Sequence, residues 1–311
     1  MKKLLNLLSV VIIVTFLSSC SDDDDTIIET NTIVDVAINN NLSSLVAAVT
    51  KADLADTLSG IGVFTVFAPS NAAFQALLDS NASWNSIDDI PVETLRSVLL
   101  FHVLSGTIES TDLSDTYVNT LSTGINDEPL SLQVEVTGGV EFNGDANPIT
   151  VDVEASNGIV HVIDKVMLPP NVVTLALNNS GFTSLVAALT DSRHTTDFVT
   201  ILSGDGPFTV FAPTNAAFQA LLDSNSSWSS LADVPIATLE SVLLYHVVSG
   251  ANVQSDQLSN GDVTTLGGVV TIDLTTGAQI KTTSSQIANI IIVDVQGTNG
   301  VVHAIDTVLL P

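Results

Sequence analysis

Basic residues are scarce in this sequence. Its 311 residues contain 7 Lys and Arg against 34 Asp and Glu, which gives a formal net charge of −27 at pH 7. Nucleic-acid binding rests largely on Lys and Arg that neutralise phosphates, so nucleic acid is a poor candidate partner, and an anionic lipid surface is an equally poor electrostatic one. Adaptation to salty surroundings explains the acidic surplus better than calcium binding, because no Asp-x-Asp-x-Asn-Gly loop is present.

Cysteine is nearly absent, since Cys20 is the only one in the chain. It ends the opening stretch MKKLLNLLSVVIIVTFLSSC, in which two lysines precede an apolar run at 4–17. That run is too short to span a bilayer but matches a signal-peptide core. The closing LSSC resembles the bacterial lipoprotein cleavage box, which predicts a signal peptide at 1–19 and a lipidated Cys20. The alternative is an ordinary secretory signal with a chance cysteine. With Cys20 lipidated, no thiol remains for disulfides or metal binding.

A run of acidic residues follows this cysteine. The stretch SDDDD resembles the signal that sends many Bacteroidetes lipoproteins to the outer cell surface. We therefore expect residues 20–30 to be a lipidated, acidic tether, with the protein anchored in the outer membrane through its lipids. Exposure on the cell surface is the first expectation, and the periplasmic face is the second.

Aromatic residues are also few, at 5% of the chain. Glycosidases usually place two carboxylates in a cleft lined by aromatics, so a glycan-cleaving enzyme is not expected. No Gly-x-Ser-x-Gly nucleophile elbow occurs either. Trp84 and Trp228 fall at equivalent places in an internal repeat, which favours shared packing over a sugar platform.

The internal repeat divides the chain. GVFTVFAPSNAAFQALLDSNASW at 62–84 matches the segment at 206–228 at 20 of 23 positions. Three more blocks recur in the same order, at 43–50 and 183–190, 98–106 and 242–250, and 157–169 and 299–311. The repeated segments at 62–84 and 206–228 start 144 residues apart, and a repeat of that length is the size of a whole domain. We therefore expect one domain at 31–169 and another at 171–311, joined stiffly through two prolines.

The most similar block predicts a buried strand followed by a helix. FTVFAP is apolar and β-branched, and SNAAFQALLDS is rich in helix formers. Ser70 and Thr214 stand where an N-cap residue is expected. Later stretches, such as LSLQVEV at 130–136, PITVDV at 148–153 and VVTIDL at 269–274, alternate apolar and polar residues. Alternation predicts strands with one buried and one wet face, so each domain should be α+β.

The histidines stand in structural settings. His102 and His246 fall on the apolar face of a predicted helix, where a neutral imidazole can tie two backbone groups together. His161 and His303 follow Asn-Gly turns into predicted strands. His194 lies in a polar loop found only in the second half. For His102 and His246 the alternative is a metal ligand or a general base, but no Cys, Glu or second His stands at metal spacing on that helix face. Neither a metal nor a cofactor is expected.

These blocks resemble the fasciclin domain. TVFAPSNAAF and TVFAPTNAAF are similar to its first signature, and NGIVHVIDKVMLP and NGVVHAIDTVLLP are similar to its second. Tyr245–His246 resembles the tyrosine–histidine pair between them, whereas the first half has Phe101–His102. The resemblance implies two tandem, wedge-shaped β-sandwiches with flanking helices. It also implies an extracellular adhesion role.

The resemblance further implies candidate contact residues. An Asp-Ile pair before the second signature, together with the Tyr-His region, is tied to integrin contact in animal members of the family. The matching residues here are Asp152–Val153 and Asp294–Val295, with Tyr245 and His246 beside them. The other interpretation is that each aspartate is simply a solvated strand residue.

Two functions follow as hypotheses. The first is a non-enzymatic surface lipoprotein that adheres to a cell-surface or matrix protein, to polysaccharide or to its own kind. Two copies of one domain would then raise avidity for a repetitive target. The alternative is a structural envelope spacer without a dedicated ligand.

Overall fold

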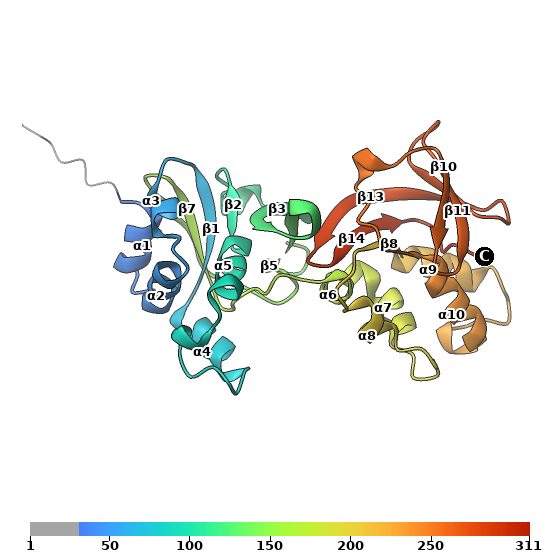
Figure 1. Cartoon of the computed structure of the whole chain (residues 1–311), viewed down its shortest axis with the longest axis horizontal. Helices are drawn as coiled ribbons and strands as arrows, with labels where there is room; N and C mark the ends of the chain where they lie inside the picture. Colours follow the sequence, from blue (N-terminus) through green and yellow to red (C-terminus); the bar gives the residue numbers. More distant parts are fainter. Residues whose placement is uncertain (1–30) are drawn as a thin grey trace, which may run out of the picture. The chain divides into compact units, whose positions relative to one another are not determined.

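The structure, a computed structural model, describes residues 31–311, which form one compact unit. The predictions of a signal peptide, of lipidation at Cys20 and of an acidic tether lie outside the described residues. Within 31–311 the same order of helices and strands occurs twice (Figure 1). In this part of the chain no single helix is long and apolar enough to cross a membrane. One bent pair, Val172–Asn178 with Ser180–Leu189, reaches the length only when both helices are taken together.

Each repeat begins with helices and ends in strands. The helices of the first repeat are α1 (Ile33–Asn39), α2 (Ser43–Lys51), α3 (Ala55–Ser59), α4 (Asn71–Asp79) and α5 (Val92–Phe101). Its strands are β1 (Phe64–Pro69), β2 (Val103–Ser105), β3 (Thr116–Thr123), β4 (Pro129–Glu135), β5 (Glu141–Phe142), β6 (Pro148–Ala155) and β7 (Gly158–Ile163).

The second repeat follows the same plan. Its helices are α6 (Val172–Asn178), α7 (Thr183–Leu189), α8 (Phe198–Leu202), α9 (Asn215–Asp223) and α10 (Ile236–Tyr245). Its strands are β8 (Phe208–Pro213), β9 (Val247–Ser249), β10 (Gly261–Thr265), β11 (Gly268–Asp273), β12 (Gln279–Lys281), β13 (Ile287–Gly297) and β14 (Gly300–Ile305). Each repeat is therefore α+β, as predicted.

The strands of each repeat form a seven-stranded sheet. In the first repeat it is β5-β4-β3-β2-β1-β7-β6, and in the second it is β10-β11-β12-β13-β14-β8-β9. The strand with the repeated FTVFAP sequence has a partner on each side in both repeats. β1 pairs in parallel with β7 and antiparallel with β2, and β8 pairs in parallel with β14 and antiparallel with β9. In the first repeat two ladders join at a single pair, Leu104 and Thr120. The strand β6 lies at one end of its sheet, so its outer edge has no neighbouring strand in the described part of the chain.

The prediction of a buried strand capped into a helix is confirmed. Every residue of β8 is buried, and in β1 only the first is not. Ser70 Oγ accepts the N–H of Ala73 at 3.2 Å, and the Thr214 hydroxyl caps α9 in the same way. The Phe74 and Phe218 side chains are buried on the inner faces of these helices. This segment is therefore core, and both tryptophans pack against the same helix-side cores.

His102 and His246 make two hydrogen bonds each to the backbone. Each follows its helix directly, and its Nδ1 lies 2.7 Å from the carbonyl oxygen four residues earlier, at Val98 and Val242. Each Nε2 accepts a backbone N–H at 2.9 Å, from Met167 and Leu309. Nε2 must therefore be the acceptor and Nδ1 the protonated nitrogen. Each imidazole ties its helix to the last segment of its repeat.

The predicted strand alternation holds in β11 but fails in β4 and β6. In β4 five consecutive residues from Leu130 are buried, because the second repeat covers the face that would otherwise be wet. The N–H of Gln296 in β13 donates to Ser131 Oγ there at 2.9 Å. In β6 no residue is buried, because two register shifts interrupt its pairing with β7.

Candidate adhesion site

The aspartates that the sequence singles out sit on bulges. Asp152 in β6 and Asp294 in β13 both have φ of +59°, and the pairing register shifts beside each. Most L-residues avoid this left-handed conformation, whereas Asp and Asn adopt it more readily. A bulge re-aims a side chain relative to a regular strand. Both carboxylates are 35% exposed.

Each carboxylate is held by a serine. The N–H of Ser110 donates to Asp152 Oδ1 at 2.8 Å, and the Ser110 hydroxyl donates to Oδ2. Ser255 holds Asp294 in the same way, with an N–H distance of 2.6 Å. The hydroxyl of Ser110 lowers the pKa of Asp152, followed by the backbone hydrogen bond. Asp152 therefore presents a fixed negative charge at neutral pH.

A buried histidine accepts a hydrogen bond from the backbone of each bulge. The N–H of Asp152 donates to His161 Nδ1 at 3.3 Å, and His161 Nε2 lies 2.9 Å from the carbonyl oxygen of Ile108. His303 makes the matching contacts, at 3.2 Å to Asp294 N and 2.9 Å to Val253 O. Burial lowers the pKa of His303, which keeps the ring neutral. Both rings therefore make hydrogen bonds of the kind that a structural role requires.

Serine, histidine and aspartate meet here without forming a nucleophilic triad. A triad needs the histidine hydrogen-bonded to the serine hydroxyl. Here the Ser110 hydroxyl donates to the carboxylate, while both nitrogens of His161 face backbone groups. The imidazole is therefore not placed to take the serine proton, and this cluster fixes the shape of the bulge.

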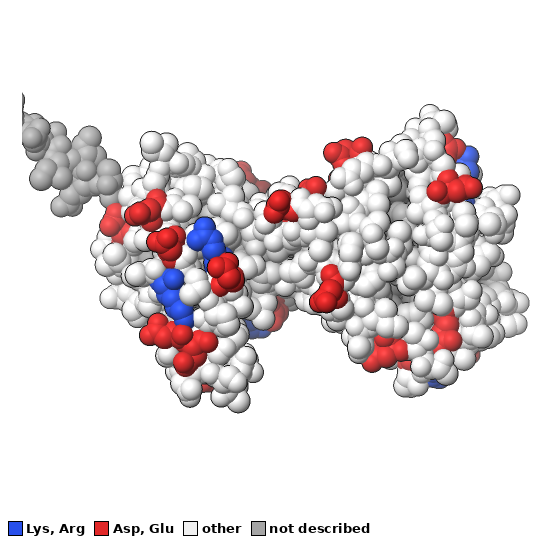
Figure 2. Space-filling model, in the orientation of Figure 1, with Lys and Arg blue, Asp and Glu red and all other residues white. Residues whose placement is uncertain are grey.

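Apolar side chains surround each bulge on the surface. Ile149 and Val151 in β6 are 58% and 39% exposed, and Ile291 and Val293 in β13 are 52% and 42% exposed. Contiguous exposed apolar groups with a charged rim are typical of protein interaction surfaces. Figure 2 shows the broader setting on one face, where charged side chains are sparse and acidic ones predominate.

The remaining candidate contact residues are placed differently. Val153 is half-buried, whereas Val295, Tyr245 and His246 are 4%, 1% and 3% exposed. The Tyr245 hydroxyl donates to Val269 O at 2.6 Å, inside the core. Side chains this buried offer no surface to a partner, so only the aspartates and Val153 remain candidates for direct contact. Tyr245 and His246 act on the fold instead.

Sequence reasoning missed Ser110 and Ser255. Each lies about 40 residues from its aspartate, at separations of 42 and 39. The signal was available in the repeat, because both serines follow the matching His-Val-x-Ser-Gly block at nearly the same distance.

The two carboxylates do not have the same surroundings. Asp294 lines a polar hollow of about 340 Å³ between the repeats, together with Glu128 and Asp256. Within residues 31–311, no group of three or more His, Cys, Asp or Glu side chains is placed to hold a metal ion.

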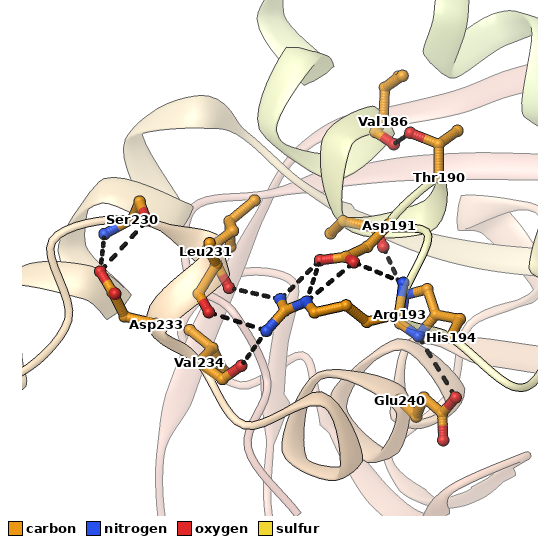
Figure 3. Close-up of polar contacts among 12 residues, drawn as sticks. Val186, Thr190, Asp191, Arg193, His194, Ser230, Leu231, Asp233, Val234 and Glu240 are labelled. Carbon is orange, nitrogen blue, oxygen red and sulfur yellow. Dashed lines mark hydrogen bonds and ion pairs between the residues drawn. The ribbon is translucent and has the colours of Figure 1, made fainter.

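Two of the few cations serve the scaffold rather than this site. Figure 3 shows Arg193 between Asp191 and a short turn, where its guanidinium donates to the Leu231, Ala232 and Val234 carbonyls. The Arg193 hydrogen bonds lower the pKa of Asp191 to about 2. In the first repeat Lys51 makes the equivalent bonds to the carbonyls of Ile87, Asp88 and Ile90.

The loop that carries Arg193 also holds the fifth histidine. His194 Nε2 lies 2.7 Å from Ala188 O, and its Nδ1 lies 3.4 Å from Glu240. The ring meets Phe198 edge-on, with centroids 5.0 Å apart. His194 therefore fixes the loop against α7 and α10.

Comparisons with known proteins agree with this architecture. The fasciclin domain family matches residues 40–169 and 180–311. A Synechocystis protein, sll1483, is 42% identical over 140 residues, which are 45% of this chain and 74% of that protein. Human periostin is 30% identical over 266 residues, covering 83% of this chain but 29% of periostin. Pig transforming growth factor-beta-induced protein ig-h3 is 28% identical over 258 residues, or 82% of this chain and 35% of that protein.

A solved structure shares the fold. It is a FAS1 domain pair from the insect cell adhesion molecule Fasciclin I, with a TM-score of 0.51 and 21% identity. The likeness covers 88% of this chain and 98% of that one, and at this identity it concerns the fold alone. Two repeats of one fold, each matched by one family, lead to a single assignment: the chain belongs to the fasciclin domain family and carries two such domains in tandem.

Proposed function

We propose that this chain is a non-enzymatic adhesion protein of the cell surface. The observation that carries the proposal is the bulge surface present in both domains, where a rigidly held carboxylate stands among exposed apolar side chains. The match of both repeats to the fasciclin domain family supports the same class of function. The partner is a surface or matrix protein, a polysaccharide or the protein's own kind.

The proposal includes a location. Residues 1–19 act as a lipoprotein signal peptide, Cys20 carries the lipids, and residues 20–30 form the tether that leads to domains at 31–169 and 171–311. The lipids anchor the chain in the outer membrane, with the domains facing the cell exterior. The composition of the first 30 residues supports this arrangement.

The role of the aspartates is tested by removing their charge alone. Beads coated with residues 31–311 are scored for binding to a matrix and polysaccharide array and to each other. The double variant Asp152→Asn/Asp294→Asn keeps a residue that tolerates the left-handed backbone. We expect at least about tenfold weaker binding, which is about 1.4 kcal/mol. Asp152→Asn alone should account for most of the loss, because Asp294 lines the hollow between the domains.

A matched control uses the other repeated aspartates. Asp164 and Asp306 follow β7 and β14, and each accepts the backbone N–H of Asn147 or Asn289. Asp164→Asn/Asp306→Asn changes the net charge equally and should leave binding intact. Equal binding by both double variants would remove the aspartates from the site while leaving adhesion in place. No binding by the unmodified protein to any surface would favour the envelope spacer.

A further inference from the structure

The two domains use matching edges differently. In the second domain, β12 pairs only with the first residues of β13, up to Asn289. The first domain contacts the later, bulged part of β13 through Ser131, which is buried and accepts the Gln296 N–H at 2.9 Å. Gln254 and Gln296 are buried beneath this contact at 7% and 2% exposure, with Gln254 Nε2 donating to Gln296 Oε1 at 2.6 Å. The side of β13 that β12 leaves unpaired is therefore already occupied by the first domain.

In the first domain, the equivalent side of β6 is open. When the two repeats are aligned, Glu109 is equivalent to Gln254 and Glu154 is equivalent to Gln296. Both glutamates are exposed. Among the described residues, no side chain accepts the N–H of Glu154. The strand β6 ends its sheet, and its Ile149 and Val151 project into solvent. The surface that the first domain covers on β13 is thus left uncovered on β6.

The complementary surface is open on the second domain. The strand pairings show which residues of the two hairpins are equivalent. In the first domain Leu132 pairs with Val118, and Ser131 comes just before Leu132. In the second domain Val270 pairs with Val263, and Val269 comes just before Val270. Val269 of the β10–β11 hairpin therefore stands where Ser131 does. Val269 is 40% exposed, and Leu266 in the turn of the hairpin is exposed as well. An apolar hairpin and an apolar edge remain free at the two ends of the repeat.

We propose that these two surfaces meet between copies of this chain, so that the β10–β11 hairpin of one copy docks on the β6 edge of the next. This inference rests on the proposed adhesion function and names its partner as a second copy. The contact is heterologous, so it generates head-to-tail chains rather than a closed dimer. It repeats between molecules the packing that joins the two domains within one.

Charge sets the conditions for this contact. Glu109 and Glu154 flank the β6 edge, and Asp262 lies on the hairpin, so acidic groups face each other across the contact. Salt screens repulsion between exposed charges, with a Debye length of about 8 Å at physiological ionic strength and about 3 Å at 1 M. Association should therefore strengthen as the salt concentration rises.

Sedimentation of residues 31–311, the compact unit that carries both cores, tests the proposal at low and at high salt. The unmodified unit should form concentration-dependent oligomers. Ile149→Arg and Val269→Arg alter exposed side chains on the two proposed surfaces, and each should weaken association at least about tenfold, which is about 1.4 kcal/mol. Ile291→Arg is the matched control at the equivalent of Ile149, and it should associate as the unmodified unit does.

Mixing the two variants gives the sharpest result. The Ile149→Arg chain keeps an intact hairpin and the Val269→Arg chain keeps an intact edge, so an equimolar mixture should form one-to-one dimers and stop there. Unmodified protein that stays monomeric at about 100 μM in both salts would overturn the proposal, as would a mixture without dimers or an Ile291→Arg variant as defective as Ile149→Arg. Beads that bind the array while the protein sediments as a monomer would overturn self-association but leave the proposed function standing.

Discussion

Replacing Gly158 with alanine is expected to destabilise the first domain by about 4 kcal/mol or more, at the severe end of single substitutions. Gly158 has φ of +151° and pairs with Phe64 in the central parallel ladder. An added Cβ would overlap the carbonyl oxygen of Phe64, which is backbone and cannot rotate away. This overlap can be removed only by moving β1 away from β7, and both strands contribute side chains to the hydrophobic core. The loss is a large fraction of the roughly 5–15 kcal/mol that stabilises a typical domain.

The measurement is denaturant unfolding followed by tryptophan fluorescence. Trp84 packs against the core of the first domain and Trp228 against that of the second. A Trp228→Phe background lets Trp84 report on the first domain alone. The control is Gly138→Ala, where φ is +97° but no atom lies within 4 Å of the new Cβ. It should cost only the left-handed backbone penalty, about 1–2 kcal/mol. Similar losses at both positions would contradict the steric argument.

Acidification from pH 6.5 to 4 is expected to weaken each domain by about 3 kcal/mol through one histidine. Burial lowers the pKa of His102 and of His246 from 6.5 to about 4. The folded protein therefore holds these rings neutral, while the unfolded chain takes up protons below pH 6.5. This stability is fully present above pH 6.5 and is lost as the pH falls toward 4. Each pH unit in this window corresponds to about 1.4 kcal/mol per histidine.

A domain-specific variant checks this expectation. His102→Gln removes the titrating ring from the first domain while His246 remains in the second. Unfolding free energies measured at several pH values should lose their slope between pH 6.5 and 4 when Trp84 is followed, and should keep it when Trp228 is followed. A slope at Trp84 that survives the substitution would assign the acid sensitivity to other groups.

The sequence predicted those parts of the fold that depend on local pattern. The central strand, the caps Ser70 and Thr214, and the buried His102 and His246 all follow from residue type and spacing, and the repeat doubled each signal. Two tandem fasciclin domains were likewise predictable, because their signature blocks occur twice in order.

The candidate site was only partly predictable, because it depends on distant contacts. The aspartates lie in a sequence that alternates like a regular strand, yet each sits at a positive φ on a bulge held by a serine about 40 residues away. The burial of β4 depends on the other domain, since Ser131 is covered by β13. Neither effect leaves a periodic mark in the sequence.

Display of the full chain on bacteria is the most direct test of adhesion at the cell surface. The full chain would be expressed in a bacterium that lacks it, beside a Cys20→Ser chain that cannot be lipidated. Cells with the unmodified chain should aggregate or bind the array, and protease added outside the cells should cleave their chain. The Cys20→Ser cells should neither adhere nor show this cleavage. Cells that carry the chain on their surface, yet adhere no better than the Cys20→Ser cells, would contradict the account.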